Sequence, residues 1–250
     1  MKNGLVLSGG GARGFAHLGV LQALDELDIH IDAMAGTSAG AMACAFYAAG
    51  HKPEETLKLI QSYRIYHWIR ILWRKPGILN MRKIAEMFSE NLPESFEKLK
   101  LPLTVTATDI VNGELRYFNS GELVPAICAS SCIPIMFEPI KFGGTQFVDG
   151  GLLNNFPIEA LLGKTENIIG VNVNPIGKTE NQIHIKNIMD RSLHLALDKA
   201  IRDKEKSCTV FIEPKGCEDF GMLDLTNADK IFKIGYEATM EKKEELLKLK

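Results

Sequence analysis

The chain has 250 residues, of which 46% are hydrophobic and 24% charged, with a formal net charge of −2 at pH 7. This length and composition predict one globular domain with a sizeable core, and the near-neutral charge argues against a nucleic-acid partner. The five cysteines, at 44, 128, 132, 208 and 217, include no C-x-x-C pair, so we expect neither a disulfide framework nor a structural zinc site.

The first apolar run, residues 5–7, predicts a short buried strand. It is too short for the core of a signal peptide, and no weakly polar run reaches the ~18 residues that a membrane span requires. We therefore expect a cytoplasmic protein with reduced thiols.

A glycine-rich loop, Ser8-Gly9-Gly10-Gly11-Ala12-Arg13-Gly14, separates this strand from a helix that apolar periodicity predicts over 15–27. The spacing of Gly9, Gly11 and Gly14 matches a dinucleotide-binding fingerprint. That motif expects an acidic residue at the end of the next strand, whereas Asp32 precedes the residues of that strand. The dinucleotide interpretation is therefore the weaker one.

The same loop is suited to an oxyanion hole. Gly9, Gly10 and Gly11 expose backbone N–H groups without side-chain obstruction, at a helix N-terminus whose dipole favours negative charge. Arg13 adds a cation beside them. The loop therefore predicts a site for the negative charge of a tetrahedral intermediate.

The next motif is Gly36-Thr37-Ser38-Ala39-Gly40, between a strand predicted at 31–35 and a helix predicted at 41–49. It matches the nucleophile elbow G-x-S-x-G, in which a sharp strand-to-helix turn exposes a serine hydroxyl. Gly36 and Gly40 suit the tight geometry of such a turn. Ser38 is therefore the candidate nucleophile.

A helix predicted at 53–63 leads into segment 64–75, which contains both tryptophans of the chain and several arginines. At helical spacing, the basic residues share one side and the apolar residues another, as in helices that lie in a membrane interface. A helix that caps the core, with arginines reaching into water, explains the same pattern. Both interpretations stay open.

The rest of the chain continues to alternate between helices and strands. The remaining predicted helices are 81–91, 124–132, 188–206 and 227–248, and the remaining predicted strands are 101–108, 115–118, 146–149, 168–173 and 208–212. Apolar strands that alternate with helices predict an α/β fold with a mainly parallel central sheet.

Ser38 requires a base, and Asp149 is the candidate. It ends a predicted strand, where α/β enzymes place their chemistry, and Gly150-Gly151 allows a tight turn after it. A carboxylate held against the hydroxyl in a dry site can act as a general base. The alternative is a triad with a histidine: His184 and His194 follow an acid in the usual order, but neither stands in a glycine-punctuated loop. Helix packing explains His17 better.

Three motifs in this order resemble the patatin-like phospholipase family, and most closely its short bacterial members. They are residues 9–14, 36–40 and 149–151, and stretches 106–109, 129–134 and 154–157 are similar to the family as well. The resemblance covers roughly 4–175, the motif-bearing core of a single domain 1–250. The helical part, about 176–250, carries no assigned motif.

The resemblance implies a three-layer α/β/α fold and a Ser–Asp dyad without a catalytic histidine. By matching position, Ser38 is the nucleophile and Asp149 the base. The oxyanion hole comprises the amides of the loop glycines, with Arg13 nearby, and the motif glycines are Gly14, Gly36, Gly40, Gly150 and Gly151. Many members have alanine at the position of Gly151, and no lipid-anchoring or nucleotide-binding domain is apparent in this chain.

We therefore predict a serine acyl-ester hydrolase that releases a free fatty acid from phospholipids or related lipids and needs no metal and no cofactor. A lysophospholipase, monoacyl esterase or thioesterase is an alternative, and so is a non-catalytic lipid- or nucleotide-binding module. If 64–75 binds lipid, the protein makes peripheral contact with the inner face of the membrane. The residues do not indicate acyl-chain length, headgroup preference or oligomeric state.

Overall fold

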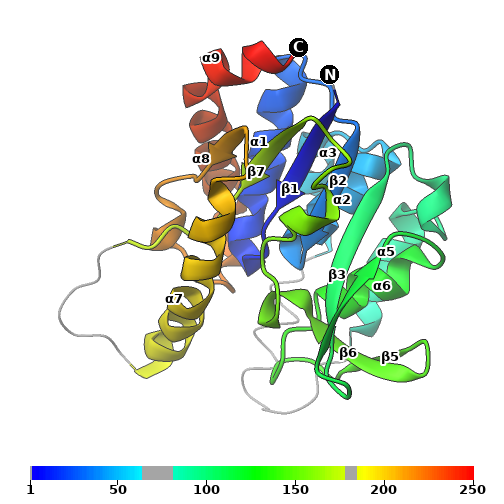
Figure 1. The fold of residues 1–250 in the computed structure, drawn as a ribbon. Helices are drawn as coiled ribbons and strands as arrows, with labels where there is room; N and C mark the ends of the chain where they lie inside the picture. Colours follow the sequence, from blue (N-terminus) through cyan, green and yellow to red (C-terminus); the bar gives the residue numbers. More distant parts are fainter. Residues whose placement is uncertain (1, 64–80, 178–184) are drawn as a thin grey trace.

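A computed structural model describes residues 2–63, 81–177 and 185–250 (Figure 1). Segment 64–75, with its two open interpretations, lies outside the described residues. Both interpretations of it therefore stay predictions.

The described residues form one sheet with helices around it. The strands are β1 (Asn3–Leu7), β2 (Ala33–Thr37), β3 (Leu103–Asp109), β4 (Glu114–Phe118), β5 (Ile140–Phe142), β6 (Thr145–Asp149), β7 (Asn167–Val171) and β8 (Val210–Ile212). The α-helices are α1 (Phe15–Glu26), α2 (Ala39–Ala49), α3 (Pro53–Ser62), α5 (Arg82–Asn91), α6 (Leu123–Ser130), α7 (Ile185–Glu205), α8 (Ala228–Glu241) and α9 (Lys243–Leu246).

The sheet is mainly parallel, as the sequence predicted. Strands β3, β2, β1, β7 and β8 lie side by side in that order, and each neighbouring pair is parallel. Strand β4 and the hairpin β5–β6 add antiparallel partners around β3. All carboxyl ends of the parallel strands therefore meet at one edge of the sheet, where the loops after β1 and β2 lie.

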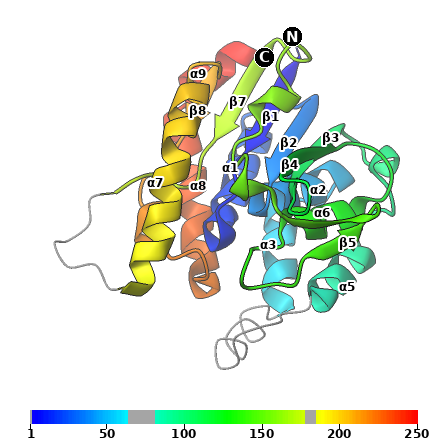
Figure 2. The same ribbon diagram turned by 60° about the horizontal axis from the view of Figure 1, so that its bottom comes forward.

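Helices cover both faces of this sheet. Successive side chains of a strand point to opposite faces, and accordingly Leu5 and Leu7 of β1 join a large apolar core while Val6 joins a smaller one. The large core includes residues of α1, α2, α6 and α8, whereas the smaller one includes Ile201 of α7 and residues 156–161. Figures 1 and 2 show the resulting three-layer α/β/α arrangement.

Helix α8, near the end of the chain, packs along α1. The two helices approach so closely that a Cβ at Gly19 would clash with the carbonyl oxygen of Phe232, and a Cβ at Gly235 would clash with that of Ala16. Glycine at both positions therefore allows α8 to pack directly against α1, the helix that follows the glycine loop.

Two strands share one edge of β3, and this arrangement shapes the site. Strands β4 and β6 both pair with Ala107, so they occupy opposite edges of β3. Strands β4 and β2 both pair with Thr106, so they too are opposite, and β2 and β6 lie on the same edge. Thr37 pairs with Thr106 and Asp149 with Ala107, so the carboxyl ends of β2 and β6 meet head-on.

Two elements differ from the prediction. Strand β5 was missed, because it has only three residues and pairs with β6 across a turn in which Gly143 and Gly144 have φ of 56° and 84°. The helix predicted at 227–248 ends at Glu241, and a short second helix follows. After this break Leu246 is fully buried in the large core, and helical periodicity within the segment does not reveal that contact.

Candidate active site

Ser38 lies between β2 and α2, at the turn that the elbow motif predicts. Its φ of 53° and ψ of −123° are rare for a residue with a side chain, and such strain occurs where the surrounding structure enforces it. A Cβ at Gly40 would clash with the carbonyl oxygen of Leu7, and one at Gly36 would lie 2.7 Å from the amide nitrogen of Ala41. Both glycines therefore let α2 start tightly against β1 and β2.

The hydroxyl of Ser38 donates a hydrogen bond to Asp149, with 2.5 Å between Oγ and Oδ2. The second carboxylate oxygen, Oδ1, accepts a bond from the amide of Gly151 at 2.8 Å. Both side chains are buried, with Ser38 6% and Asp149 7% exposed. The two residues are far apart in sequence and are brought together because β2 and β6 end against each other on β3.

The electrostatic environment of Asp149 suits a base. Burial raises the pKa of its carboxyl to about 6, while the hydrogen bonds from Ser38 and Gly151 act in the opposite direction. A carboxylate with this pKa is ionised at neutral pH and holds a proton more readily than an exposed aspartate does. Burial therefore makes the Asp149 carboxylate a stronger base toward the Ser38 hydroxyl than an exposed aspartate would be.

The motif glycines are packed between the two halves of the site. A Cβ at Gly14 would clash with that of Ala39, the residue after the nucleophile. A Cβ at Gly150 would clash with the carbonyl oxygen of Thr106, next to the point where β2 and β6 meet. These positions allow the glycine loop, the elbow and the aspartate turn to touch one another.

The glycine loop lies beside the elbow, but not all of its backbone amides are available for an oxyanion hole. The amide of Gly9 donates to the carbonyl oxygen of Asn155 at 3.1 Å, so it is not free to hold an oxyanion, which corrects the prediction for this residue. The amides of Gly10 and Gly11 have no hydrogen-bond partner within the part of the chain that the structure describes. Gly10 precedes, and Gly11 begins, the single helical turn Gly11–Gly14 that leads into α1.

Arg13 is buried and braces the loop. Its Nε donates to the carbonyl oxygen of Phe220 at 2.7 Å, and its Nη1 to the Oδ1 of Asn174 at 3.4 Å. The amide of the neighbouring Ala12 donates to the carbonyl oxygen of Met222 at 2.7 Å. The bonds to Phe220 and Met222 join the glycine loop to a segment more than two hundred residues later, and the bond to Asn174 joins it to the residues after β7.

The histidines weighed against Asp149 contribute no base in the described residues. The Nε2 of His17 contacts the carbonyl oxygen of Ser8 at 2.8 Å, and burial lowers the pKa of this ring to about 4. His17 is therefore a neutral core side chain that supports the loop. His184 and the side chain of His194 lie outside what the structure describes.

Several residues that support the dyad had no role assigned from sequence. The hydroxyl of Ser130, at the end of α6, accepts a bond from the amide of Ser38 at 2.8 Å. Lys204 of α7 donates to the Oδ1 of Asn154 at 2.6 Å and pairs with Glu159 at 2.7 Å, which fixes the turn after Asp149. The similarity of stretches 129–134 and 154–157 to the family does not indicate these contacts.

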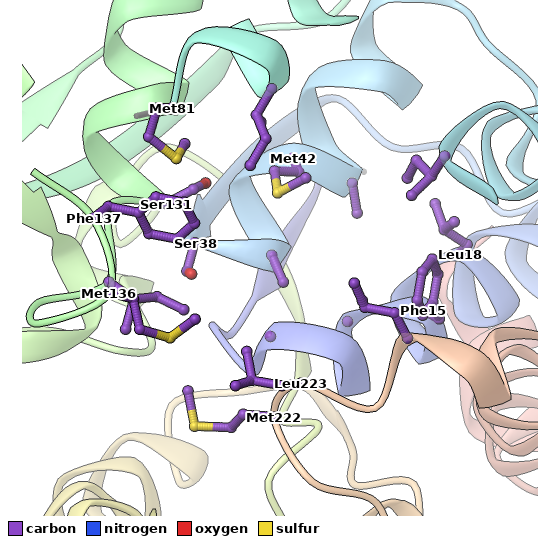
Figure 3. A pocket seen from close by; sticks show the side chains of 18 residues that line it. Phe15, Leu18, Ser38, Met42, Met81, Ser131, Met136, Phe137, Met222 and Leu223 are labelled. Atoms are coloured by element: carbon purple, nitrogen blue, oxygen red, sulfur yellow. The ribbon is translucent and has the colours of Figure 1, made fainter. Parts of the chain in front are cut away.

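An apolar pocket opens over Ser38. Its lining includes four methionines, Met42, Met81, Met136 and Met222, together with aromatic and aliphatic side chains from α1, α2, α3, α5 and the segments 131–137 and 222–225 (Figure 3). The Oγ of Ser131, also in the lining, is buried without a hydrogen-bond partner among the described residues. The pocket is therefore a mainly apolar space with the Ser38 hydroxyl in its lining, suited to a hydrocarbon chain.

The dinucleotide interpretation finds no support at the position it needs. Asp32 accepts a bond from the amide of Asn3 at 2.7 Å, at the amino end of β1 and β2, whereas the glycine loop lies at the carboxyl end. Among the described residues, no group of three or more His, Cys, Asp or Glu side chains could hold a metal ion. In the same ranges, no helix has the length and apolar character to cross a bilayer.

Comparison with known proteins adds an independent line of evidence. A family model described as patatin-like phospholipase matches residues 5–162. An uncharacterized NTE family protein of Mycobacterium tuberculosis is 34% identical over 184 residues, covering 68% of this chain and 48% of the relative. Lysophospholipase NTE1 of Mycosarcoma maydis is 26% identical over 276 residues, covering 96% of this chain and 15% of that protein.

The fold also has a counterpart among solved structures. The crystal structure of VipD from Legionella pneumophila superposes with a TM-score of 0.54 and 18% sequence identity, covering 99% of this chain and 67% of VipD. This likeness concerns the fold. The chain spans about half the length of the mycobacterial relative described above, and 28% of a second NTE family protein of the same organism.

Proposed function

Because the chain belongs to the patatin-like phospholipase family, we propose that it is a serine hydrolase that cleaves acyl esters of lipids through Ser38 and Asp149. The observation that carries this proposal is the 2.5 Å hydrogen bond to the Asp149 carboxylate from the hydroxyl of Ser38, which lines an apolar pocket. A nucleophile, a base and a place for an acyl chain are adjacent.

In the proposed reaction, Asp149 accepts the Ser38 proton while Oγ forms a bond to the acyl carbonyl carbon. The carbonyl π electrons move to its oxygen, and the amides of Gly10 and Gly11 stabilise the resulting oxyanion. When the intermediate collapses, the ester C–O bond breaks and the leaving alkoxide takes the proton from Asp149. Asp149 then takes a proton from water as the water oxygen attacks the acyl carbon of the acyl-enzyme. When this second intermediate collapses, the bond from the acyl carbon to Oγ breaks, Oγ takes the proton back from Asp149, and the fatty acid leaves.

The experiment that tests the dyad uses a fluorophosphonate probe and a set of lipid esters. Wild type is expected to be labelled and Ser38→Ala unlabelled. Asp149→Asn should lose ester hydrolysis by at least about a hundredfold, since general base catalysis typically contributes ~10²–10⁴. His17→Gln, His184→Gln and His194→Gln are controls for a triad and should retain most of the activity. Equal labelling of wild type and Ser38→Ala would refute the nucleophile, and loss of activity in a folded His184→Gln or His194→Gln variant would refute the dyad.

A lipid with a single acyl chain is the second candidate substrate. The observation in its favour is the alignment of 96% of this chain with a relative described as a lysophospholipase. Rates on a lysophospholipid, the matching two-chain phospholipid, a monoacylglycerol and an acyl thioester distinguish the candidates. A preference for the two-chain lipid would exclude a lysophospholipase. No hydrolysis of any ester, with no probe labelling, would favour a non-catalytic lipid-binding module.

We also propose peripheral contact with a lipid surface near the pocket mouth. Ile135 is 85% exposed, and its neighbours Ile133, Met136 and Phe137 line the pocket. An exposed large apolar side chain beside such an opening suits insertion between headgroups. Ile135→Asp should lower binding to anionic phospholipid vesicles in a flotation assay, while Leu162→Asp, outside the pocket lining, should not. Equal binding by all three proteins would contradict this contact.

A further inference from the structure

The carbonyl oxygen of Gly9 is held by two buried side-chain amides. The Nδ2 of Asn174 donates to it at 2.6 Å, and the Nδ2 of Asn155 donates at 3.4 Å. Asn174 is 5% exposed and Asn155 9%. The peptide group between Gly9 and Gly10 is therefore fixed from outside the loop, and mainly by Asn174.

This hold has a consequence for the neighbouring amide. A trans peptide is planar, so the N–H of Gly10 points opposite to the C=O of Gly9. A peptide between two glycines can otherwise rotate as a unit at little steric cost, because neither residue has a Cβ. Such a rotation would place a carbonyl oxygen where the N–H had been, and the loop would then repel an oxyanion.

Asn174 is itself oriented by its surroundings. Its Oδ1 accepts a bond from Arg13 Nη1 at 3.4 Å, and since a guanidinium only donates, the amide Nδ2 faces Gly9. Its backbone amide donates to the Oδ1 of Asn172 at 3.2 Å. Asn174 reaches the loop because β7 runs parallel to β1, with Leu7 beside Val171.

From these contacts we infer that Asn174 is a positioning residue for the oxyanion hole: its side-chain amide holds the Gly9 carbonyl in place and thereby directs the Gly10 N–H toward the reacting carbonyl. Asn174 lies beyond residues 5–162, which match the family model. The inference rests on the proposed ester hydrolysis. It adds a residue that acts through the peptide it holds and does not touch the substrate.

The test uses Asn174→Asp and Asn174→Ala. Aspartate keeps the shape and the contact with Arg13 but presents an oxygen to the Gly9 carbonyl, whereas alanine removes the donor. Asn3→Asp is the matched control, because Asn3 is 2% exposed and donates its side-chain amide to two carbonyls at the other end of β1. Folding of each variant is checked by thermal unfolding.

The readout is the ratio of kcat/KM for a p-nitrophenyl ester to that for its thiono analogue. The thiono sulfur accepts hydrogen bonds poorly, so this ratio reports the contribution of the oxyanion hole. Because loss of one oxyanion donor costs ~10²–10³ in rate, a misdirected donor should lower the ester kcat by about 10- to 100-fold with KM nearly unchanged. The thiono rate should change little, so the ratio should fall in both Asn174 variants and stay at the wild-type value in Asn3→Asp.

Two results would overturn the inference. An unchanged ratio in both folded Asn174 variants means that the Gly10 amide keeps its direction without this side chain. If both Asn174 variants fail to fold, Asn155→Ala replaces them, because it removes the weaker donor to the Gly9 carbonyl. A ratio of ester to thiono ester kcat/KM that stays at the wild-type value in Asn155→Ala would then overturn the inference, and a lower ratio would support it. A wild-type protein that hydrolyses no ester and takes no fluorophosphonate label would refute the hydrolase proposal itself, which is a different outcome.

Discussion

Ser38 occupies a backbone conformation that side chains avoid, with φ of 53° and ψ of −123°. Residues held in such regions store of order 1–3 kcal/mol of strain, which glycine escapes. The strain belongs to the turn that exposes the hydroxyl. It should therefore appear as a stability difference between two variants that both lack the nucleophile.

We expect Ser38→Gly to be more stable than Ser38→Ala by about 1 kcal/mol or more, measured by urea unfolding at neutral pH. Ala43→Gly in α2 is the control. Here glycine should lower the free energy of unfolding relative to alanine, because glycine costs ~0.5–1 kcal/mol relative to alanine within a helix. Equal stability of the two Ser38 variants would show that the turn is unstrained.

The pKa of Asp149 sets the expected pH dependence of activity. Burial raises this pKa to about 6, and only the ionised carboxylate can accept the Ser38 proton. Activity should therefore be full above the pKa and fall as pH drops through it, by about tenfold per pH unit well below it. The measurement is kcat/KM for a neutral ester between pH 4.5 and 8.5. An acid limb centred near pH 4 would mean that the carboxyl is well solvated.

At the scale of single elements, the packing of α8 on α1 allows a sharp test. Alanine normally favours a helix over glycine by ~1 kcal/mol, but a Cβ at position 235 would clash with the Ala16 carbonyl oxygen. Gly235→Ala should therefore lower the free energy of unfolding by roughly 1–3 kcal/mol. Gly221→Ala is the matched control, since a Cβ there meets no atom within 4 Å. A stabilised Gly235→Ala would show that α8 can move away from α1 without cost.

The segment that carries Met222 and Leu223 forms one wall of the pocket. Methionine adapts its shape to what it contacts, so this wall suits acyl chains of more than one length. Met222→Trp should fill part of the space and reduce kcat/KM for a palmitoyl ester by at least about tenfold relative to a butyryl ester. Leu162→Trp, outside the lining, should leave that ratio unchanged. An equal loss on both esters would place the acyl chain elsewhere.

On the scale of the whole molecule, the late part of the chain is interleaved with the early part. Arg13 bonds the carbonyl of Phe220, Ala12 bonds that of Met222, and Lys204 fixes Asn154. The match to the family model ends at 162, before three of these partners. These contacts support the proposal that 1–250 is a single cooperative domain, although its motifs lie in the first part.

This proposal predicts one unfolding transition. In scanning calorimetry, the calorimetric and van't Hoff enthalpies should agree, as they do for a two-state domain. A fragment of residues 1–175 should fail to fold, because it would expose the faces of α1 and the sheet that α8 and α7 cover. Two separated transitions, or a folded fragment with wild-type activity, would contradict a single domain.

Local patterns in the sequence predict most of the strands and helices and identify the chemical groups of the site. Apolar runs and helical periodicity predicted the order of strands and helices, because an element that buries one face has apolar residues at regular spacing in the sequence. The elbow at Ser38 and the turn after Asp149 can also be recognised in the sequence, since both need glycines at defined positions. The short strand β5 and the end of α8 were not, because pairing partners and core contacts distant in sequence decide them.

How these groups meet depends on contacts between segments that are distant in the sequence. Ser38 and Asp149 lie within hydrogen-bonding distance because β2 and β6 end on the same edge of β3, a register that no local pattern encodes. The same holds for Gly9, whose amide is taken by the carbonyl of Asn155, and for Asn174, whose amide holds the Gly9 carbonyl. The residue type determines which hydrogen bonds a group can donate or accept. Which partner lies within hydrogen-bonding distance depends on how the strands and loops pack in the fold.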